Sequence, residues 1–438
     1  MTRRMLLRLA VVLAAVAGAL LPARLLDAQG PDRGIVVATW TDAISFHPYQ
    51  TTDTASGSFQ GLVYAGSLVE HDPQDIEKLV GNLAERWSVS DDRLTYTFTL
   101  RPDLKWSDGE PLTAEDFKWT YDQANQPGSG WTYAGNISGI VSYDAPDART
   151  LVVRMAEPLV VGLEQADAIT PLPKHVWEHL DWSDPSRNPE IMAPTVGSGP
   201  FRLLEWVPDS HAIFVPNDYY FKGRPRLAHY TVVVLRPEDN GYQLLRAGQV
   251  DYSSIRPADY ALAQRLENVT VYDWWPATGN WTYLGFNFRQ PLLQDVRVRQ
   301  ALAYAVDRNA IIQQVEYGLA RPTYSAYGPT CWCYNPDVPH RDYDLDRARA
   351  LLDDAGFVPG PDGIRVKDGQ PLHLRLVYGP ASETRARIAD LVRESFRAVG
   401  VDVEDIGLPW EPYLALLKTS PYRWDLQLGA WQATIDPH

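Results

Sequence analysis

The chain has 438 residues, of which 45% are hydrophobic, and its formal net charge at pH 7 is −15. This length and apolar content predict two or three folded domains. The acidic charge argues against binding to nucleic acids or to anionic membrane surfaces, because both require a basic face.

The N-terminal segment predicts export. Arg3, Arg4 and Arg8 precede an apolar run over residues 9–21. That run is too short to span a bilayer and is typical of the hydrophobic region of a signal peptide. We expect residues 1–28 to be removed, with a retained membrane anchor as the alternative. No cysteine lies near the cleavage region, so a lipid-attachment signal is absent, and we expect a periplasmic or extracellular protein.

Residues 35–48 predict a strand that leads into a loop, and residues 83–122 predict a strand, a turn and a helix. Apolar and threonine residues alternate over 94–100, which is the period of a half-buried strand. Residues 107–109, Ser-Asp-Gly, have turn chemistry. Thr113 is an expected N-cap, and Asp116 completes an approximate capping box.

Two histidines and two glycines in the next part of the chain raise alternatives. His175 and His179 have the spacing of metal ligands on one helix face, but no HExxH motif is present and a structural role is favoured. Gly197 and Gly199 indicate unusual backbone angles or close approach of two backbones. No GxxxxGK[ST] sequence follows, so a phosphate loop is not indicated. Strands are expected over 201–206, 211–217 and 229–235, then a helix and strand over 241–252.

The last part of the chain predicts alternating helices and strands. Residues 283–312 contain an expected amphipathic helix, with Asp295 near its start, where a carboxylate favours the helix dipole. A strand is expected over 372–378 and a further helix over 383–401. The residues expected on the apolar face of the first helix are Val296, Val298, Ala301, Leu302, Ala305 and Val306.

The two cysteines, Cys331 and Cys333, are separated by one residue. A pair of free thiols and a disulfide formed in an oxidising compartment both remain open. Two thiols alone fall short of the four ligands of a structural zinc site, and we expect neither a metal nor a cofactor.

Two segments carry a resemblance to one protein family. LAERWSVSDDRLTYTFTLRPDLKWSDGEPLTAED, residues 83–116, and YLGFNFRQPLLQDVRVRQALAYAVDRNAII, residues 283–312, resemble the solute-binding proteins of ABC importers for peptides and nickel. The resemblance extends over nearly all of residues 35–438.

The resemblance implies an α/β fold of the periplasmic-binding-protein type, two-lobed, of class II and its large three-domain subtype. Residues 29–59 and 193–280 would form domain I, residues 60–192 domain II, and residues 281–438 domain III. Because members of the family usually continue further, we expect the C-terminal part of the fold to be missing from this sequence.

The implied function is that of an extracytoplasmic receptor, likewise taken from the resemblance. Such a receptor binds peptides in a cleft that closes between two lobes and delivers them to permease subunits in the membrane. It would act as a monomer. The same fold in relatives takes oligosaccharides or metal chelates, which are the alternatives. A secreted hydrolase is a further alternative, but no GxSxG, SxxK, HExxH or phosphate-loop motif supports it, and we expect no enzyme.

The resemblance also implies positions for the ligand. Trp410 and Trp431 stand where peptide-binding relatives place cleft tryptophans. In such relatives an aspartate three residues after the second tryptophan binds the peptide amine. Thr434 stands at that place here, so the carboxylate is absent or Asp436 substitutes from a shifted position.

Other candidates for the cleft are weaker. Arg385 and Arg387, at the start of an expected helix, are possible partners for a carboxylate. The remaining candidates are Thr51, Asp53 and Tyr64 after the first strand, Asn287 in GFNF, and Trp332 between the cysteines.

Overall fold

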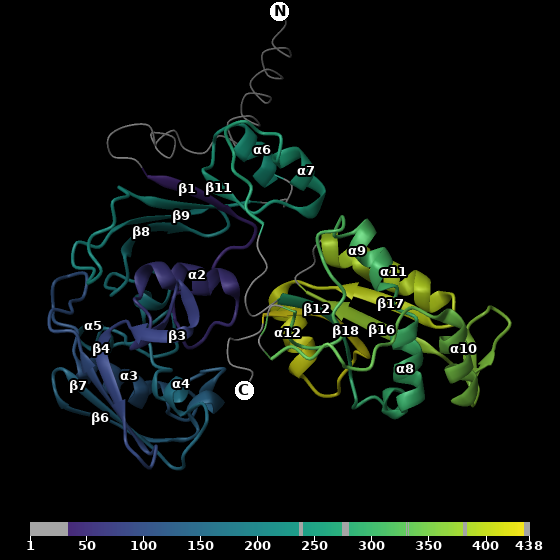
Figure 1. The fold of residues 1–438 in the computed structure, drawn as a ribbon, viewed down its shortest axis with the longest axis horizontal. Helices are drawn as coiled ribbons and strands as arrows, with labels where there is room; N and C mark the ends of the chain where they lie inside the picture. Colours follow the sequence, from purple (N-terminus) through teal and green to yellow (C-terminus); the bar gives the residue numbers. More distant parts are fainter. Residues whose placement is uncertain are drawn as a thin grey trace, which may run out of the picture. The chain divides into compact units, whose positions relative to one another are not determined.

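The computed structural model describes residues 34–235, 240–273, 280–329, 331, 333–379 and 383–432 (Figure 1). The expected signal peptide lies outside these residues. The chain divides into two compact units, one ending at Ile255 and the other beginning at Arg256. Within the described residues, no helix has both the length and the apolar character needed to cross a membrane.

The first unit contains a five-stranded sheet with the order β11-β1-β10-β9-β8. Strand β1 pairs in parallel with β10 and β11, while β10, β9 and β8 pair antiparallel. Helix α6, Asn240–Arg246, precedes β11 in the sequence. The strands are β1 Ile35–Thr39, β8 Phe201–Val207, β9 His211–Pro216, β10 Tyr230–Val234 and β11 Tyr252–Ser253.

A second, antiparallel sheet of the first unit has the order β4-β5-β7-β6, and β2 pairs with β3 beside it in sequence. The strands are β2 Val69–Asp72, β3 Asp75–Gly81, β4 Ala84–Val89, β5 Thr95–Leu100, β6 Ile140–Asp147 and β7 Thr150–Met155. The helices are α2 Thr54–Val63, α3 Ala114–Ala124, α4 Gly162–Ala166 and α5 Lys174–Trp177, with single 3₁₀ turns at Ala134–Ile137 and Pro189–Ile191.

The strand, turn and helix expected near residue 100 are confirmed. Tyr96, Phe98 and Leu100 of β5 are buried, as the alternation predicts. Gly109 takes a positive φ of 95° in the turn that follows. At the start of α3, the Asp116 carboxylate accepts a hydrogen bond from the Thr113 backbone N–H at 2.8 Å, which is the reciprocal half of a capping box.

The second unit is built on a four-stranded sheet with the order β12-β18-β16-β17. Strand β16 runs parallel to β17 and β18, and the edge strand β12 runs antiparallel to β18. The strands are β12 Asn280–Phe286, β16 His373–Tyr378, β17 Asp402–Gly407 and β18 Leu426–Gln432; a smaller sheet joins β13 Val358–Pro359, β14 Arg365–Lys367 and β15 Gln370–Pro371.

Helices cover both faces of this sheet. Leu374 and Leu428 lie in one hydrophobic cluster with residues of α8, α10 and α11. Val377 lies in another cluster, with residues of α12. The helices are α7 Tyr260–Ala263, α8 Val296–Tyr304, α9 Arg308–Gln314, α10 Leu345–Asp354, α11 Glu383–Arg397 and α12 Trp410–Lys418, with 3₁₀ turns at Pro257–Asp259 and Pro291–Gln294.

The expected apolar face of α8 is confirmed in part. Val298, Ala301, Leu302 and Ala305 are buried, and they follow the i, i+3, i+4, i+7 series of one helix face. The prediction was wrong for Val296, which is 50% exposed because it is the first helical residue and falls outside that series. Asp295 caps the helix by accepting a hydrogen bond from the Arg297 backbone N–H at 2.9 Å. Val306, just after the helix, is partly buried against the same cluster.

The two glycines of the VGSGP segment allow close approach of backbones. Neither has a positive φ. A Cβ atom on Gly199 would lie 2.6 Å from the Leu62 carbonyl oxygen, at the end of α2. The Gly199 backbone N–H donates to the Val63 carbonyl oxygen at 2.7 Å. The segment therefore fixes the end of α2 against the start of β8. The assignment of residues in this unit to domains I and II stays a prediction.

Substituting alanine for Gly199 is expected to lower the free energy of unfolding by about 1–3 kcal/mol, because the new methyl group would overlap backbone atoms that cannot rotate away. The melting temperature of the full chain measures this. Gly61→Ala is the matched control, since Gly61 is exposed within α2 and a Cβ atom there meets nothing within 4 Å. That control should raise the stability by up to about 1 kcal/mol. Equal melting temperatures for the two variants would contradict the close approach.

Candidate functional site

An aromatic surface lies where β12 and β18 pair. Trp281 lies opposite Trp431, and Tyr283 lies opposite Gly429. Because side chains alternate between the faces of a strand, these residues share one face of the sheet. Gln427 belongs to the same face. We call this set, Trp281, Tyr283, Gln427, Gly429 and Trp431, the aromatic face.

Tyr283 is held in place across the neighbouring strand. A Cβ atom on Gly429 would lie 2.5 Å from the Tyr283 hydroxyl, so the ring occupies the space that this glycine leaves open. The Gln427 side-chain amide donates a hydrogen bond to the Tyr283 hydroxyl at 2.9 Å. Burial raises the pKa of Tyr283, and the phenol is therefore neutral at physiological pH.

Helix α12 brings two more aromatic residues to this side of the sheet. Val377 pairs with Gln427 and packs against α12, so the helix covers the face to which Gln427 belongs. Tyr413 is buried, and its ring centroid lies 5.8 Å from that of Trp410. Burial and then the nearby Tyr283 raise the pKa of Tyr413 to about 12, opposed by a hydrogen bond with Gln427 and by the charge of Arg385.

The aromatic groups of this site lie at one end of the sheet, where the parallel strands have their carboxyl ends. Trp431 is near the carboxyl end of β18, and Trp410 begins the helix that follows the carboxyl end of β17. Trp281 is near the start of the antiparallel strand β12, which places it at the same edge. Open α/β sheets bind ligands at the carboxyl ends of their parallel strands. Trp431 is also 56% exposed, so part of the aromatic face is accessible.

The structure places Asn287 beyond the opposite end of β12, about 20 Å from Trp281 along the strand. Asn287 follows the last residue of β12, whereas Trp281 is near its first. Its side-chain amide donates to the Trp424 carbonyl oxygen at 2.9 Å, and its side-chain oxygen accepts from the Arg289 backbone N–H at 3.2 Å. These bonds give Asn287 a structural role.

Arg387 also bonds to backbone. Its guanidinium donates to the carbonyl oxygen of Gln314, the last residue of α9, at 2.7 Å. Cationic side chains stabilise helix C-termini in this way. Arg385 differs, since its positive charge acts to lower the pKa of two tyrosines. These are Tyr283 on the aromatic face and Tyr413 on α12.

The three candidates of the first unit lie around α2. The Asp53 carboxylate accepts from the Ser56 backbone N–H at 2.8 Å and caps the helix. The Thr51 hydroxyl accepts from the Gln60 side chain at 2.8 Å. Tyr64 follows the last turn and is buried, and burial raises its pKa well above the usual range. Asp53 and Thr51 thus organise the start and flank of one helix.

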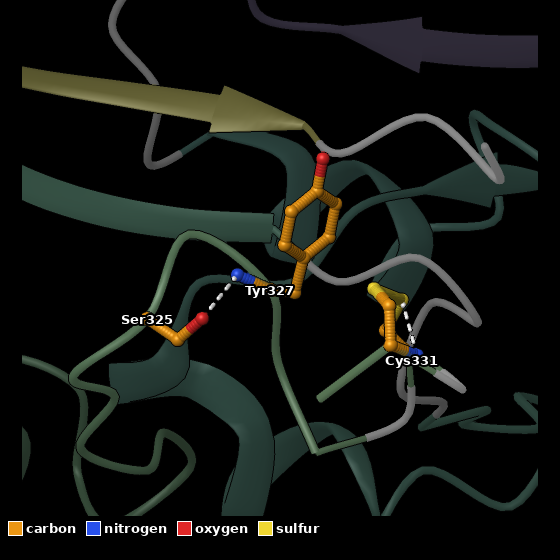
Figure 2. The surroundings of a disulfide bond; sticks show 4 residues. Ser325, Tyr327 and Cys331 are labelled. Atoms are coloured by element: carbon orange, nitrogen blue, oxygen red, sulfur yellow. Dashed lines mark hydrogen bonds between the residues drawn. A yellow bond between two sulfur atoms is a disulfide. The ribbon is translucent and has the colours of Figure 1, made fainter. Parts of the chain in front are cut away.

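Three candidates, Trp332, Thr434 and Asp436, lie outside the described residues. The cysteines on either side of Trp332 form a disulfide, with their Cα atoms 5.2 Å apart (Figure 2). The Cys333 backbone N–H donates to Cys331 Sγ at 3.4 Å, and nearby the Tyr327 backbone N–H donates to the Ser325 hydroxyl at 3.2 Å. Of the two alternatives left open by the sequence, the structure has the disulfide.

The two spaced histidines lie near different carboxylates. His175 Nε2 lies 2.8 Å from an Asp108 oxygen, and His179 Nε2 lies 3.6 Å from a Glu178 oxygen. In the part of the chain that the structure describes, no three His, Cys, Asp or Glu side chains are grouped so that they could hold a metal ion.

Comparison with known proteins identifies relatives of this chain. Residues 78–438 match the family model described as bacterial extracellular solute-binding proteins, family 5 Middle. The oligopeptide-binding protein AppA of Bacillus subtilis is 27% identical over 418 residues, covering 93% of this chain and 75% of AppA. A putative ABC transporter peptide-binding protein of Brucella ovis is 29% identical over 350 residues, covering 80% of this chain and 64% of that protein.

Solved structures give the same result for the fold. The structure of Bacillus subtilis AppA in complex with a nonapeptide matches with a TM-score of 0.83 at 26% identity, covering 92% of this chain and 80% of that chain. The structure of NikZ from Campylobacter jejuni in complex with Ni(L-His) matches with a TM-score of 0.80 at 23% identity, covering 92% and 78%. These matches confirm the expected α/β fold of the periplasmic-binding-protein type.

Opening the disulfide is expected to cost little stability, because the ring it closes contains three residues and constrains the unfolded chain by only about 1.5 kcal/mol. Replacing both cysteines by serine should therefore lower the melting temperature by at most about 6 °C, measured by calorimetry. Reductant added to the wild-type protein should reproduce this change, and reductant added to the double variant should have no effect. A larger decrease would mean that the disulfide supports contacts beyond its own ring.

Proposed function

We propose that the chain, which belongs to the bacterial extracellular solute-binding proteins of family 5, is the extracytoplasmic receptor of an ABC importer for peptides. The relatives support this proposal by their names, since AppA is an oligopeptide-binding protein and an Escherichia coli relative, 28% identical over 400 residues, is a dipeptide-binding protein. The chain spans 64–75% of the length of the relatives named here.

The observation that carries the proposal is the aromatic face at the carboxyl edge of the second sheet. Peptide side chains vary, so a peptide receptor needs surfaces that accept many groups without specific contacts. Trp281 and Trp431 offer such a surface, because indole rings give a large apolar contact area and a polar N–H. The Tyr283 hydroxyl accepts from Gln427, and its own proton can be donated to a peptide carbonyl oxygen.

The ends of the peptide require charged partners. Arg385 lies close enough to act on Tyr283 and Tyr413, and we assign it to the recognition of a ligand carboxylate. The described strands of the aromatic face, β12 and β18, contain no Asp or Glu. Recognition of the peptide amine is therefore assigned to Asp436, with Thr434 and Trp332 as further contacts. Thr51, Asp53 and Tyr64 remain proposed contacts from the first unit.

The rest of the proposal follows from the family. The receptor works outside the cytoplasm, as a monomer, after export by its signal peptide, and delivers its ligand to permease subunits in the membrane. The family consists of solute-binding proteins, and we propose no catalytic activity.

A thermal-shift screen of the full chain against di- to nonapeptides, oligosaccharides and nickel–histidine chelates tests the ligand class. A ligand at a hundred times its dissociation constant should add about 2.7 kcal/mol to the stability. We expect peptides to raise the melting temperature. In Trp431→Ala, the same shift should require at least a tenfold higher peptide concentration, because the substitution removes an exposed indole at the proposed contact.

The matched control is Phe288→Ala. Phe288 is 60% exposed, belongs to the same unit and follows β12 at the opposite edge of the sheet. Its removal should leave peptide binding unchanged. A shift with sugars or chelates alone would overturn the peptide assignment. A peptide shift that Trp431→Ala leaves intact would keep peptide binding but overturn the role of the aromatic face.

A further inference from the structure

His47 is an enclosed imidazole in the loop between β1 and α2. Its side chain has no exposed surface. Its ring meets the edges or faces of Tyr49, Trp177 and Trp182 at centroid distances of 6.0, 5.4 and 4.8 Å, each at close to a right angle. Water cannot reach an imidazole in these surroundings, so its charged form is strongly disfavoured.

The hydrogen bonds of His47 fix which nitrogen carries the proton. The backbone N–H of Tyr49 donates to Nδ1 at 3.2 Å, so Nδ1 must be the unprotonated acceptor. Nε2 lies 2.8 Å from the Trp182 carbonyl oxygen and must therefore donate its proton to it. A second proton could bind only at Nδ1, where it would oppose the N–H of Tyr49. The neutral tautomer suits this site, and the imidazolium ion does not.

The described groups around the ring do not offset the free-energy cost of a buried imidazolium ion. Burial lowers the pKa of His47 to about 4, partly opposed by the hydrogen bond to Trp182. Tyr49 is the titratable residue in ring contact, and burial raises its pKa, so it is neutral throughout the acid range. No charged side chain of the described residues contributes to the shift of His47. Gln60 and Ser45 contact its backbone through neutral groups.

We propose that His47 is a pH-sensitive connection between two loops, which joins residues 45–53 to the Trp182 loop while it is neutral and releases them when it is protonated. The first loop leads directly into α2. It contains Thr51, which accepts from Gln60 of that helix, and Asp53, which caps it. Acid therefore opens a region that includes candidate ligand contacts, which is a property beyond the proposed function and independent of it.

The direction of the pH dependence follows from the two pKa values. The unfolded or opened loop has an ordinary imidazole pKa of about 6.5, and the closed loop has a pKa of about 4. The closed state is therefore fully stabilised above pH 6.5 and loses stability as the pH falls from 6.5 to 4. The equilibrium constant for opening should rise by up to about 300-fold over this range.

Another buried group in the same unit acts in the opposite direction. Burial raises the pKa of Asp167 to about 7, although its carboxylate accepts from the backbone N–H groups of Leu68 and Val69. A carboxyl with a raised pKa destabilises the folded state as the pH rises. The overall melting temperature thus combines two opposed effects, and the test must compare variants that differ at His47 alone.

Hydrogen exchange of the full chain, read by mass spectrometry between pH 7 and pH 4 and corrected for intrinsic rates, tests the proposal. We expect peptides covering residues 45–53 and 177–188 to lose protection as the pH falls, while the core strand β5 stays protected. His47→Gln should remove this pH dependence, because glutamine offers one acceptor and one donor and does not titrate. His179→Gln, at an 85% exposed side chain, should behave like the wild type.

A protection pattern in residues 45–53 that does not change with pH in the wild type would overturn the proposal, as would the same slope in His47→Gln. Should His47→Gln fail to fold, the exchange of the imidazole C2 proton in the wild type decides the matter. That exchange should titrate well below pH 6.5 for His47, and a midpoint at the ordinary value would refute the connection.

Discussion

The register between β12 and β18 is the constraint on which the candidate site depends. These strands pair over seven residues although they lie more than 130 residues apart in the sequence. One face of the pair carries the tryptophans and Tyr283, and the other carries Leu284 and Leu428 toward α8, α10 and α11. A slip of one residue would exchange the two faces, turning the aromatic residues toward α8, α10 and α11 and the leucines toward α12.

Two residues beyond the strand hold that register. Asn287 bonds to the backbone of Trp424 and, through its own N–H, to Asp425, just before β18 begins. Gln290 donates to the carbonyl oxygens of Tyr422 and Trp424 at 2.8 and 2.9 Å. Asn287 remains a proposed ligand contact, and its observed bonds align the strand that presents the aromatic face. A buried amide serves either purpose equally well, so the sequence alone could not separate them.

The parts of the fold that could be predicted are those determined by neighbouring residues. Alternation located β5, the Thr113 and Asp116 pair located the start of α3, and the helical period located most of α8. The family resemblance, now confirmed, supplied the fold class and the interest in Trp410 and Trp431. Trp281, Tyr283 and Gln427 were missed because their common face exists only after β12 pairs with β18. The tautomer of His47 likewise depends on Trp182, which is 135 residues away.

The glycine beneath the Tyr283 ring has a thermodynamic consequence for any ligand of the aromatic face. Because Gly429 provides the space and Gln427 holds the hydroxyl, the ring is already ordered before a ligand arrives. Ordering a free side chain on binding costs about 0.5–1.5 kcal/mol of entropy, and that cost is met here during folding. A bulkier residue at position 429 would release the ring and move this entropic cost from folding to binding, even if the area of contact stayed the same.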